Sequence, residues 1–259
     1  MNHTAIAAGL ALPFIWLCLR LKILTLGGGV MAGLIAMAVV ASQGWPWLIP
    51  LFVFLISGVL LGRLNKTART DAKHGKPRDA VQVFCNGGVY AVLALFAGNE
   101  AFIWMAVSIC ISTCDTWASE VGMYARWPTI NLATFKRVPI GLSGGVSLAG
   151  TMAGFVGAFV VGMVTWPIAF PELSGHNAWS VVLATAIMAF VPSLWLAAIG
   201  SAGMLLDSLL GAFLQAKYDD GAGISDRGTR QVGGFRWMTN DLVNLISNAA
   251  TVGVAMLWL

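Results

Sequence analysis

Long apolar stretches dominate this sequence and limit the kind of structure that it can adopt. They recur at lengths of about 15–23 residues, which suits helices that cross the hydrocarbon core of a bilayer. We place them near residues 4–19, 23–41, 46–62, 80–97, 101–118, 141–164, 178–200 and 241–259. Only 10% of the residues are charged, whereas soluble domains have about 25%. The sequence therefore predicts an all-α, polytopic membrane helix bundle of about eight spans, forming one integral membrane domain over residues 1–259.

The basic residues predict how these spans are oriented. All fifteen Lys and Arg side chains lie in alternate loops, whereas the loops near 42–45, 98–100 and 165–177 have none. By the positive-inside rule, this alternation places the basic loops in the cytoplasm and both termini outside. The net charge of +4 is therefore interpreted as a topology signal, and no nucleic-acid partner is expected.

Two segments need a separate interpretation. If the shorter apolar piece 201–214 crossed the membrane fully, the basic loop 215–240 would lie outside. We therefore expect 201–214 to be a continuation of the preceding span, a broken helix or a re-entrant segment. The first 20 residues lack a basic n-region, which predicts a retained first span rather than a cleaved signal peptide. The lack of a transit-like start favours a bacterial or archaeal plasma membrane.

A carboxylate near the end of the fifth apolar run is the first candidate for function. An ionised Asp115 facing lipid would cost roughly 2.5–3.5 kcal/mol on insertion scales, so its side chain should face protein, water or a cation. At helical spacing, Ser108, Ser112, Asp115, Ser119 and Gly122 share one face. This stripe predicts a metal or substrate site inside the membrane protein, although a buried Asp that only serves packing remains an alternative.

The other polar residues of the spans are predicted to lie in the same layer. With the orientation above, Gln82 and Asn86 lie just inside the fourth span, and 141–147 forms the first turn of the sixth. Asp207 lies in the segment held at the cytoplasmic side. Asp241 begins the last span, where Asn244 and Asn248 continue its face at i+3 and i+7. We therefore expect one polar layer that faces the cytoplasm.

Carboxylates in such a layer suit phosphate chemistry with a divalent cation. Mg²⁺ prefers carboxylate oxygens and is commonly shared with substrate phosphates. The candidate ligands are Asp115, Asp207 and Asp241, with Asn86 and Asn244 as further oxygen donors. Ser143, Gly144 and Gly145, at a predicted helix start, could offer backbone N–H groups to an anion. Loop cations could clamp phosphates, and the candidates are Lys136, Arg137, Arg227, Arg230 and Arg236.

Five motifs occur in a fixed order along the chain. They are QVFCNG (82–87), DTWASEVG (115–122), GLSGGVS (141–147), DSLLGA (207–212) and NDLVN (240–244). With these motifs the chain resembles the integral-membrane family that includes transmembrane protein 19 and the plant phytyl-phosphate kinase. That family looks distantly similar to dolichol kinase and CDP-diacylglycerol synthase.

The resemblance implies CTP-dependent, Mg²⁺-assisted transfer of a phosphoryl group to an isoprenoid (prenyl or phytyl) monophosphate. The polar core that it implies is Asn86, Asp115, Glu120, Asp207 and Asp241, with Glu120 joining the metal ligands and 143–145 near phosphate. The expected partners are CTP or another nucleoside triphosphate, a prenyl phosphate lipid and the membrane. Two alternatives remain: a lipid cytidylyltransferase that uses the same site, and a cation-coupled transporter or lipid flippase.

Overall fold

Eight α-helices and two small sheets make up the described part of the chain in the computed structural model, which covers residues 3–64, 77–170, 178–219, 221 and 223–258. The helices are α1 (His3–Arg20), α2 (Leu26–Gln43), α3 (Leu48–Leu64), α4 (Ala80–Phe96), α5 (Ala101–Ala125), α6 (Leu148–Ala169), α7 (Ala178–Leu214) and α8 (Asn240–Trp258). Short 3-10 helices at Trp45–Trp47 and Gly98–Glu100 precede α3 and α5. The predicted polytopic helix bundle is confirmed.

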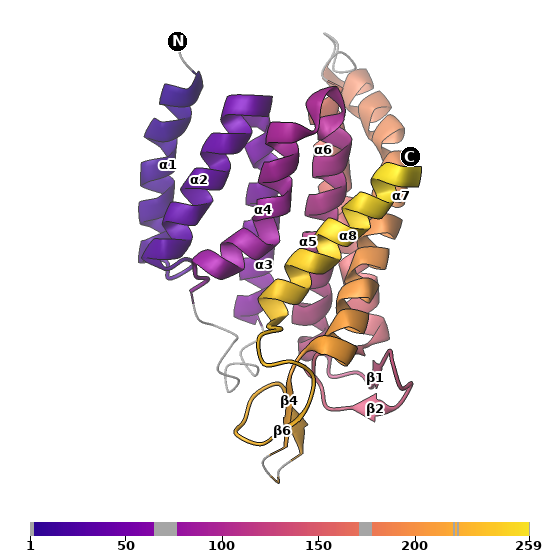
Figure 1. The fold of residues 1–259 in the computed structure, drawn as a ribbon. Coiled ribbons are helices and arrows are strands. Elements are labelled where there is room, and N and C mark those ends of the chain that lie inside the picture. The colour runs from indigo at the N-terminus through magenta and orange to yellow at the C-terminus, as the bar shows by residue number, and fades with distance from the viewer. Residues whose placement is uncertain (1–2, 65–76, 171–177, 220, 222, 259) are drawn as a thin grey trace.

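Most of these helices have the length and hydropathy of membrane spans. Within the described residues, six helical segments are long and apolar enough to cross a bilayer, and α1 and α4 contain shorter apolar helices. The long connections that carry the strands lie on one side of the bundle, and both chain ends lie toward the opposite side (Figure 1). The protein is therefore an integral membrane protein with its largest connections on one side.

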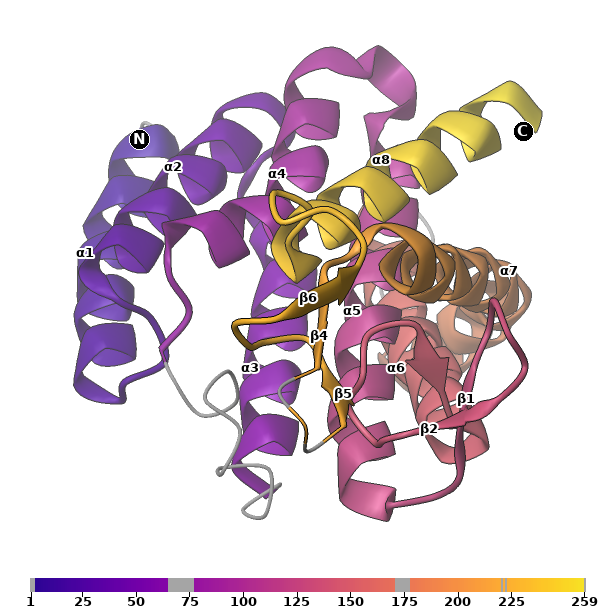
Figure 2. The same ribbon diagram turned by 60° about the horizontal axis from the view of Figure 1, so that its bottom comes forward.

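Helix α5 forms the centre of the bundle (Figure 2). It contacts α3, α4, α6, α7 and α8, and 72% of its apolar window is buried inside the protein. Gly150 and Gly154 of α6 lie directly against it, because an added Cβ would come within 2.6 Å of the main-chain oxygens of Ala118 and Cys114. Small residues thus let two helices approach closely, as expected for packing between membrane helices.

Two predicted boundaries are wrong, and one set of alternatives is decided. Helix α5 does not end near residue 118 but continues to Ala125, so Asp115 lies about three turns before its end. Segment 141–147 is not the first turn of the sixth span, because α6 begins at Leu148 with Ser147 as its N-cap. Of the three alternatives for segment 201–214, the continuation of the preceding span is the one observed, because α7 runs unbroken to Leu214.

Two glycines of α7 let this continuation pack closely against α5. A Cβ on Gly200 would lie 3.0 Å from the main-chain oxygen of Cys110, and one on Gly203 would lie 2.7 Å from the side chain of Ile111. These glycines therefore serve close contact with α5 rather than a break in the helix. Helix α5 extends beyond its apolar run, and Ser119 and Glu120 of that extension line the cavity described below.

Two three-stranded antiparallel sheets, absent from the all-α prediction, fold the long connections. The first has the order β2-β1-β3 and consists of β1 (Thr129–Asn131), β2 (Arg137–Val138) and β3 (Gly145–Val146). The second has the order β5-β4-β6 and consists of β4 (Lys217–Asp219), β5 (Ile224–Ser225) and β6 (Gln231–Gly233). Ile130 pairs with both Arg137 and Val146, and Gly144, just before β3, lies against Ala212 of α7.

Candidate active site

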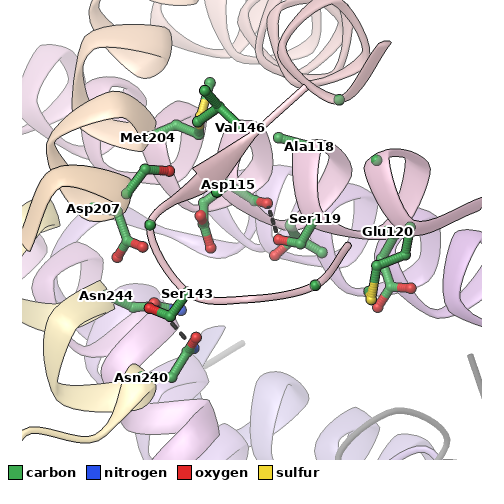
Figure 3. A pocket seen from close by; sticks show the side chains of 18 of the residues that line it. Asp115, Ala118, Ser119, Glu120, Ser143, Val146, Met204, Asp207, Asn240 and Asn244 are labelled. Atoms are coloured by element: carbon green, nitrogen blue, oxygen red, sulfur yellow. Dashed lines mark hydrogen bonds between the residues drawn. The ribbon is translucent and has the colours of Figure 1, made fainter. Parts of the chain in front are cut away.

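A cavity of about 280 Å³ lies where the helices meet the strand-bearing connections (Figure 3). Its walls come from α4, α5, α6, α7 and α8, from segment 141–147 and from single residues outside these elements, among them Arg78 and Asp226. The predicted site residues that line it are Asn86, Asp115, Glu120, Ser143, Gly144, Gly145, Asp207, Asp241 and Asn244. Residues up to 158 positions apart in the sequence therefore share one cavity, which agrees with the predicted polar layer.

Two carboxylates face the same part of this cavity. Figure 3 shows Asp115 of α5 and Asp207 of α7 pointing into it from neighbouring helices. Asp207 is held from behind, because Ser247 Oγ of α8 donates to its Oδ2 at 3.0 Å. With its amide oriented to satisfy the surrounding acceptors, Asn244 donates to the same oxygen at 3.0 Å and to the main-chain oxygen of Asn240 at 2.8 Å. Two donors thus fix one carboxylate in a single orientation.

Deeper in the bundle, the stripe predicted on α5 meets the stripe predicted on α8. Asn248 Nδ2 donates to the main-chain oxygen of Ser108 at 3.0 Å and to Ser112 Oγ at 2.9 Å, and Ser108 Oγ donates to Asn248 Oδ1 at 3.0 Å. Ser112 Oγ donates in turn to the main-chain oxygen of Asn86 at 2.8 Å. This buried network ties α8, α5 and α4 together below the cavity and so fixes the helices that carry Asp115 and Asp241.

Segment 141–147 is clamped by the second sheet. The N–H of Ser143 donates to Asp226 Oδ2 at 2.9 Å, and Ser143 Oγ donates to Gln215 Oε1 at 2.6 Å. Lys217 Nζ donates to the main-chain oxygen of Ser143 at 2.7 Å and to Asp226 Oδ1 at 2.9 Å. Burial lowers the pKa of Lys217 from its ordinary value, and the charge of Asp226 partly offsets that effect. The cavity wall is thus held by side chains from both connections.

Glycine is required where this segment approaches α7. Gly144 has a φ of +84°, which L side chains rarely adopt, and an added Cβ would lie 2.5 Å from Ala212 Cβ. Gly145 is crowded as well, because its Cβ would lie 2.6 Å from Thr129 Cγ2. The GLSGGVS motif therefore describes a turn pressed against α7 and the first sheet.

The cation at this cavity is one that the sequence analysis did not select. Lys136, Arg137 and Arg230 are exposed and do not line it. Among the described residues that line the cavity, Arg78 is the one Lys or Arg side chain. Burial lowers the pKa of Arg78, whereas the charge of Glu120 raises it, and a guanidinium stays protonated in proteins.

A sequence signal marks this position. Asp79 and Gln82 form a capping box: the N–H of Gln82 donates to Asp79 Oδ1 at 3.0 Å, and the N–H of Asp79 donates to Gln82 Oε1 at 3.1 Å. The pattern Asp-x-x-Gln before an apolar run predicts a helix start, so Arg78 could have been placed at the mouth of the fourth span. Ser247, Gln215, Lys217 and Asp226 were also missed; no motif distinguishes them from ordinary span or loop residues.

The donor chemistry of the lining suits Mg²⁺. Carboxylate and amide oxygens are the ligands that Mg²⁺ prefers, and this ion is usually bound by one or two carboxylates together with substrate phosphates. Within the described residues, no three His, Cys, Asp or Glu side chains are grouped closely enough to hold a metal ion on their own. Figure 3 places Glu120 at the opposite end of the view from Asp207. The lining therefore fits an ion that is shared with a substrate.

The fold and the cavity define a class: a polytopic helical membrane protein with an acid- and amide-lined pocket beside its large connections. Comparison with known sequences assigns the family. The profile of the family described as "Integral membrane protein DUF92" matches residues 9–252, and the chain belongs to this family. The resemblance to the family of transmembrane protein 19 and the plant phytyl-phosphate kinase is thereby confirmed. No solved structure matches the chain.

Three relatives illustrate the range of the family. An uncharacterized membrane protein of Methanocaldococcus jannaschii is 33% identical over 178 residues, which cover 67% of each chain. Protein PGR of Arabidopsis thaliana is 31% identical over 216 residues, covering 75% of this chain and 73% of the relative. The chloroplastic protein VTE6 of the same plant is 29% identical over 187 residues, covering 70% of this chain and 46% of the relative.

Proposed function

We propose that this protein transfers the γ-phosphoryl group of CTP to an isoprenoid monophosphate, giving a prenyl diphosphate and CDP. The observation that carries the proposal is the convergence of all five motifs on one acid- and amide-lined cavity in a membrane helix bundle. The protein's membership in the family that includes the plant phytyl-phosphate kinase supports phosphoryl transfer as the class of reaction. The basic connections lie on the same side as the cavity, which by the positive-inside rule favours the cytoplasmic face.

The reaction needs no nucleophilic side chain. An oxygen of the lipid phosphate attacks the γ-phosphorus, the bond from that phosphorus to the β–γ bridging oxygen breaks, and CDP leaves with the bond's electron pair. Catalysis of such a transfer rests on positioning and on neutralising charge. A protein can therefore perform it with a fixed arrangement of carboxylates, amides and one cation.

Each group of residues has a role in that arrangement. Asp115 and Asp207 would hold Mg²⁺, which when bound would neutralise charge on the triphosphate, and Asp241 lines the same cavity. Ser247 and Asn244 orient the carboxylate of Asp207. The guanidinium of Arg78 would contact phosphate oxygens.

The test is a product assay on the purified protein. The protein in phosphatidylcholine nanodiscs is given CTP labelled at the γ-phosphate, Mg²⁺ and prenyl monophosphates of different chain lengths. Labelled prenyl diphosphate and CDP are expected with the wild type, and Asp115→Asn and Asp207→Asn should reduce their formation by at least about a hundredfold, or 2.7 kcal/mol of barrier. Ala41→Phe, on the exposed face of α2, serves as the control variant.

The same assay separates the alternatives. A cytidylyltransferase would release pyrophosphate and leave a cytidylylated lipid. A transporter or flippase would move a solute or lipid across sealed vesicles without consuming nucleotide. The absence of any nucleotide turnover, with a folded protein and all chain lengths supplied, would overturn the proposal.

A further inference from the structure

A second, larger cavity lies among α1, α2, α3 and α4. Its volume is about 800 Å³, within the range of about 300–1,000 Å³ typical of small-molecule sites. Its walls are mainly aliphatic and aromatic, and they include Phe14, Ile15, Ile35, Leu51, Phe52 and Leu55. Such a lining gives no hydrogen bonds to a polar ligand but accepts a hydrocarbon chain, at about 0.8 kcal/mol for each buried CH₂.

This apolar cavity adjoins the acid-lined cavity at two residues. Arg78 and Asn86 line both of them. Apart from the indole N–H of Trp45, these two residues are also the polar side chains of the apolar lining. The guanidinium of Arg78 and the amide of Asn86 therefore lie where the apolar cavity meets the acid-lined cavity, which suits phosphate. An amphiphile with a long apolar tail and an anionic head has the matching shape.

Arg78 is held in place at this junction from several sides. Its main chain is fixed between helices, because its N–H donates to the main-chain oxygen of Ile23 at 2.9 Å and its carbonyl accepts from the N–H of Thr25 at 3.0 Å. Its guanidinium carbon lies 5.4 Å from the centre of the Phe54 ring, a cation–π contact. A Cβ on Gly58 would lie 3.0 Å from Arg78 Nη2, so that glycine makes room for the side chain.

We infer that the cavity among α1–α4 binds the hydrocarbon chain of the isoprenoid phosphate, and that Arg78 and Asn86 bind its phosphate at the junction of the two cavities. The inference rests on the proposed function for the identity of the lipid. It assigns the N-terminal half of the bundle to acceptor binding and the cavity lined by Asp115 and Asp207 to the nucleotide. The phosphate of the lipid then lies at the acid-lined cavity, while the hydrocarbon tail of the lipid stays in apolar surroundings.

The test measures binding without nucleotide, so it does not depend on catalysis. The full-length protein in phosphatidylcholine nanodiscs is titrated with a C20 prenyl monophosphate, the C20 prenyl alcohol and a C5 prenyl monophosphate. Ala36→Phe fills the cavity from α2, and Ala41→Phe places the same side chain on the exposed face of that helix as a matched control. Arg78→Gln removes the cation.

We expect a distinct pattern of affinities. Ala36→Phe should weaken binding of both C20 ligands at least tenfold and leave the C5 phosphate within about twofold, whereas Ala41→Phe should change none of them. Arg78→Gln should weaken the C20 phosphate at least tenfold, down to the affinity of the alcohol, and leave the alcohol unchanged. Equal affinity of Ala36→Phe and Ala41→Phe for the C20 phosphate would overturn the inference. Adventitious binding, in which the affinity depends neither on the length of the prenyl chain nor on the phosphate, would overturn it as well.

A second measurement avoids variants that fail to fold. A C20 prenyl phosphate with a diazirine near the end of its chain is cross-linked to the wild-type protein, and the adducts are mapped by mass spectrometry. Adducts on lining residues of α1–α3 are expected, and adducts confined to α5–α8 would refute the site. Chain-selective binding without phosphoryl transfer would leave this inference standing and reject the proposed function. Phosphoryl transfer to C20 acceptors that does not change in Ala36→Phe would reject this inference and leave the proposed function standing.

Discussion

Ser247 Oγ donates a hydrogen bond to Asp207 Oδ2 at 3.0 Å and so connects the first half of α8 to the loop-side end of α7. Ser247 is almost completely buried, with 1% of its surface exposed. The bond therefore acts on the orientation of the carboxylate from outside the cavity. In the proposed reaction Ser247 is a positioning residue, because it reaches the substrates only through Asp207.

The first prediction concerns this bond. Ser247→Ala should lower the rate of phosphoryl transfer about tenfold, because hydrogen bonds to charged groups contribute about 1.5–3 kcal/mol. The Mg²⁺ concentration that gives half the maximal rate should rise at the same time, which a general loss of stability would not cause. Ser42→Ala, which removes a hydroxyl bonded to the main-chain oxygen of Ala38 on the exposed part of α2, is the control. An unchanged Mg²⁺ dependence would reject the positioning role.

A second prediction addresses the buried network on α5 and α8. Asn248→Leu keeps the volume but removes three hydrogen bonds, leaving the hydroxyls of Ser108 and Ser112 short of partners. The free energy of unfolding in detergent should fall by about 1–3 kcal/mol. Thr165→Val should cost less, because that buried hydroxyl bonds only to Val161 of its own helix. Equal effects of the two variants would show that the network contributes little.

The network also shows how far the sequence predicts this protein. The helical stripes of α5 and α8 were visible in the sequence because membrane helices rarely carry Asp, Asn and Ser without reason. The convergence of Asp115, Asp207 and Asp241 on one cavity followed from their predicted depth, which the positive-inside rule supplied. Apolar runs and charge bias thus predict which helices exist and on which side their polar ends lie.

Other features depend on contacts that no local pattern encodes. The close approach of α6 to α5 is one of them, because Gly150 and Gly154 pack on the main-chain oxygens of Ala118 and Cys114, which are 32 and 40 residues away in the sequence. Lys217 and Asp226 hold Ser143 from the other connection. In the sequence these two residues do not differ from ordinary charged loop residues. Arg78 was interpreted only as a topology signal, because its place at the cavity depends on how α1–α4 pack.

A third prediction tests the turn against α7. Gly144→Ala should displace segment 141–147, because Gly144 has a positive φ and its new Cβ would lie 2.5 Å from Ala212 Cβ. Phosphoryl transfer should fall at least tenfold, with a lower thermal midpoint. Gly233→Ala is the matched control, because a Cβ there meets nothing within 4 Å. If both variants behaved like the wild type, the turn would not depend on this close approach.

The clamp gives a fourth prediction, on pH. Because burial lowers the pKa of Lys217 in the folded state, the unfolded chain holds that proton up to a higher pH. Between the two pKa values, the free energy of unfolding should therefore rise with pH. Compared with Lys217→Met, which cannot titrate, the wild type should gain stability as the pH rises toward the ordinary lysine pKa of about 10.4. A relative loss of stability over that range would mean that the ion pair with Asp226 dominates.

The last prediction separates two carboxylates of the same motif. Asp115 and Glu120 are five residues apart on α5, so they leave the helix in different directions. Figure 3 shows Asp115 beside Asp207 and Glu120 well away from both. Glu120 raises the pKa of Arg78 instead, and a Cβ on Gly62 of α3 would lie 3.4 Å from its Oε1. We therefore expect Glu120→Gln to act on the lipid phosphate rather than on the metal.

In steady-state kinetics, Glu120→Gln should leave the Mg²⁺ concentration for half-maximal rate within about twofold. It should lower the KM for prenyl phosphate severalfold, because the guanidinium of Arg78 loses a competing negative charge. Asp115→Asn should show the opposite pattern, with a raised Mg²⁺ requirement in whatever activity remains. If Glu120→Gln raised the Mg²⁺ requirement as strongly as Asp115→Asn, Glu120 would be a metal ligand, as the family resemblance implied, and the cavity would have to close around both ends of this motif in the working enzyme.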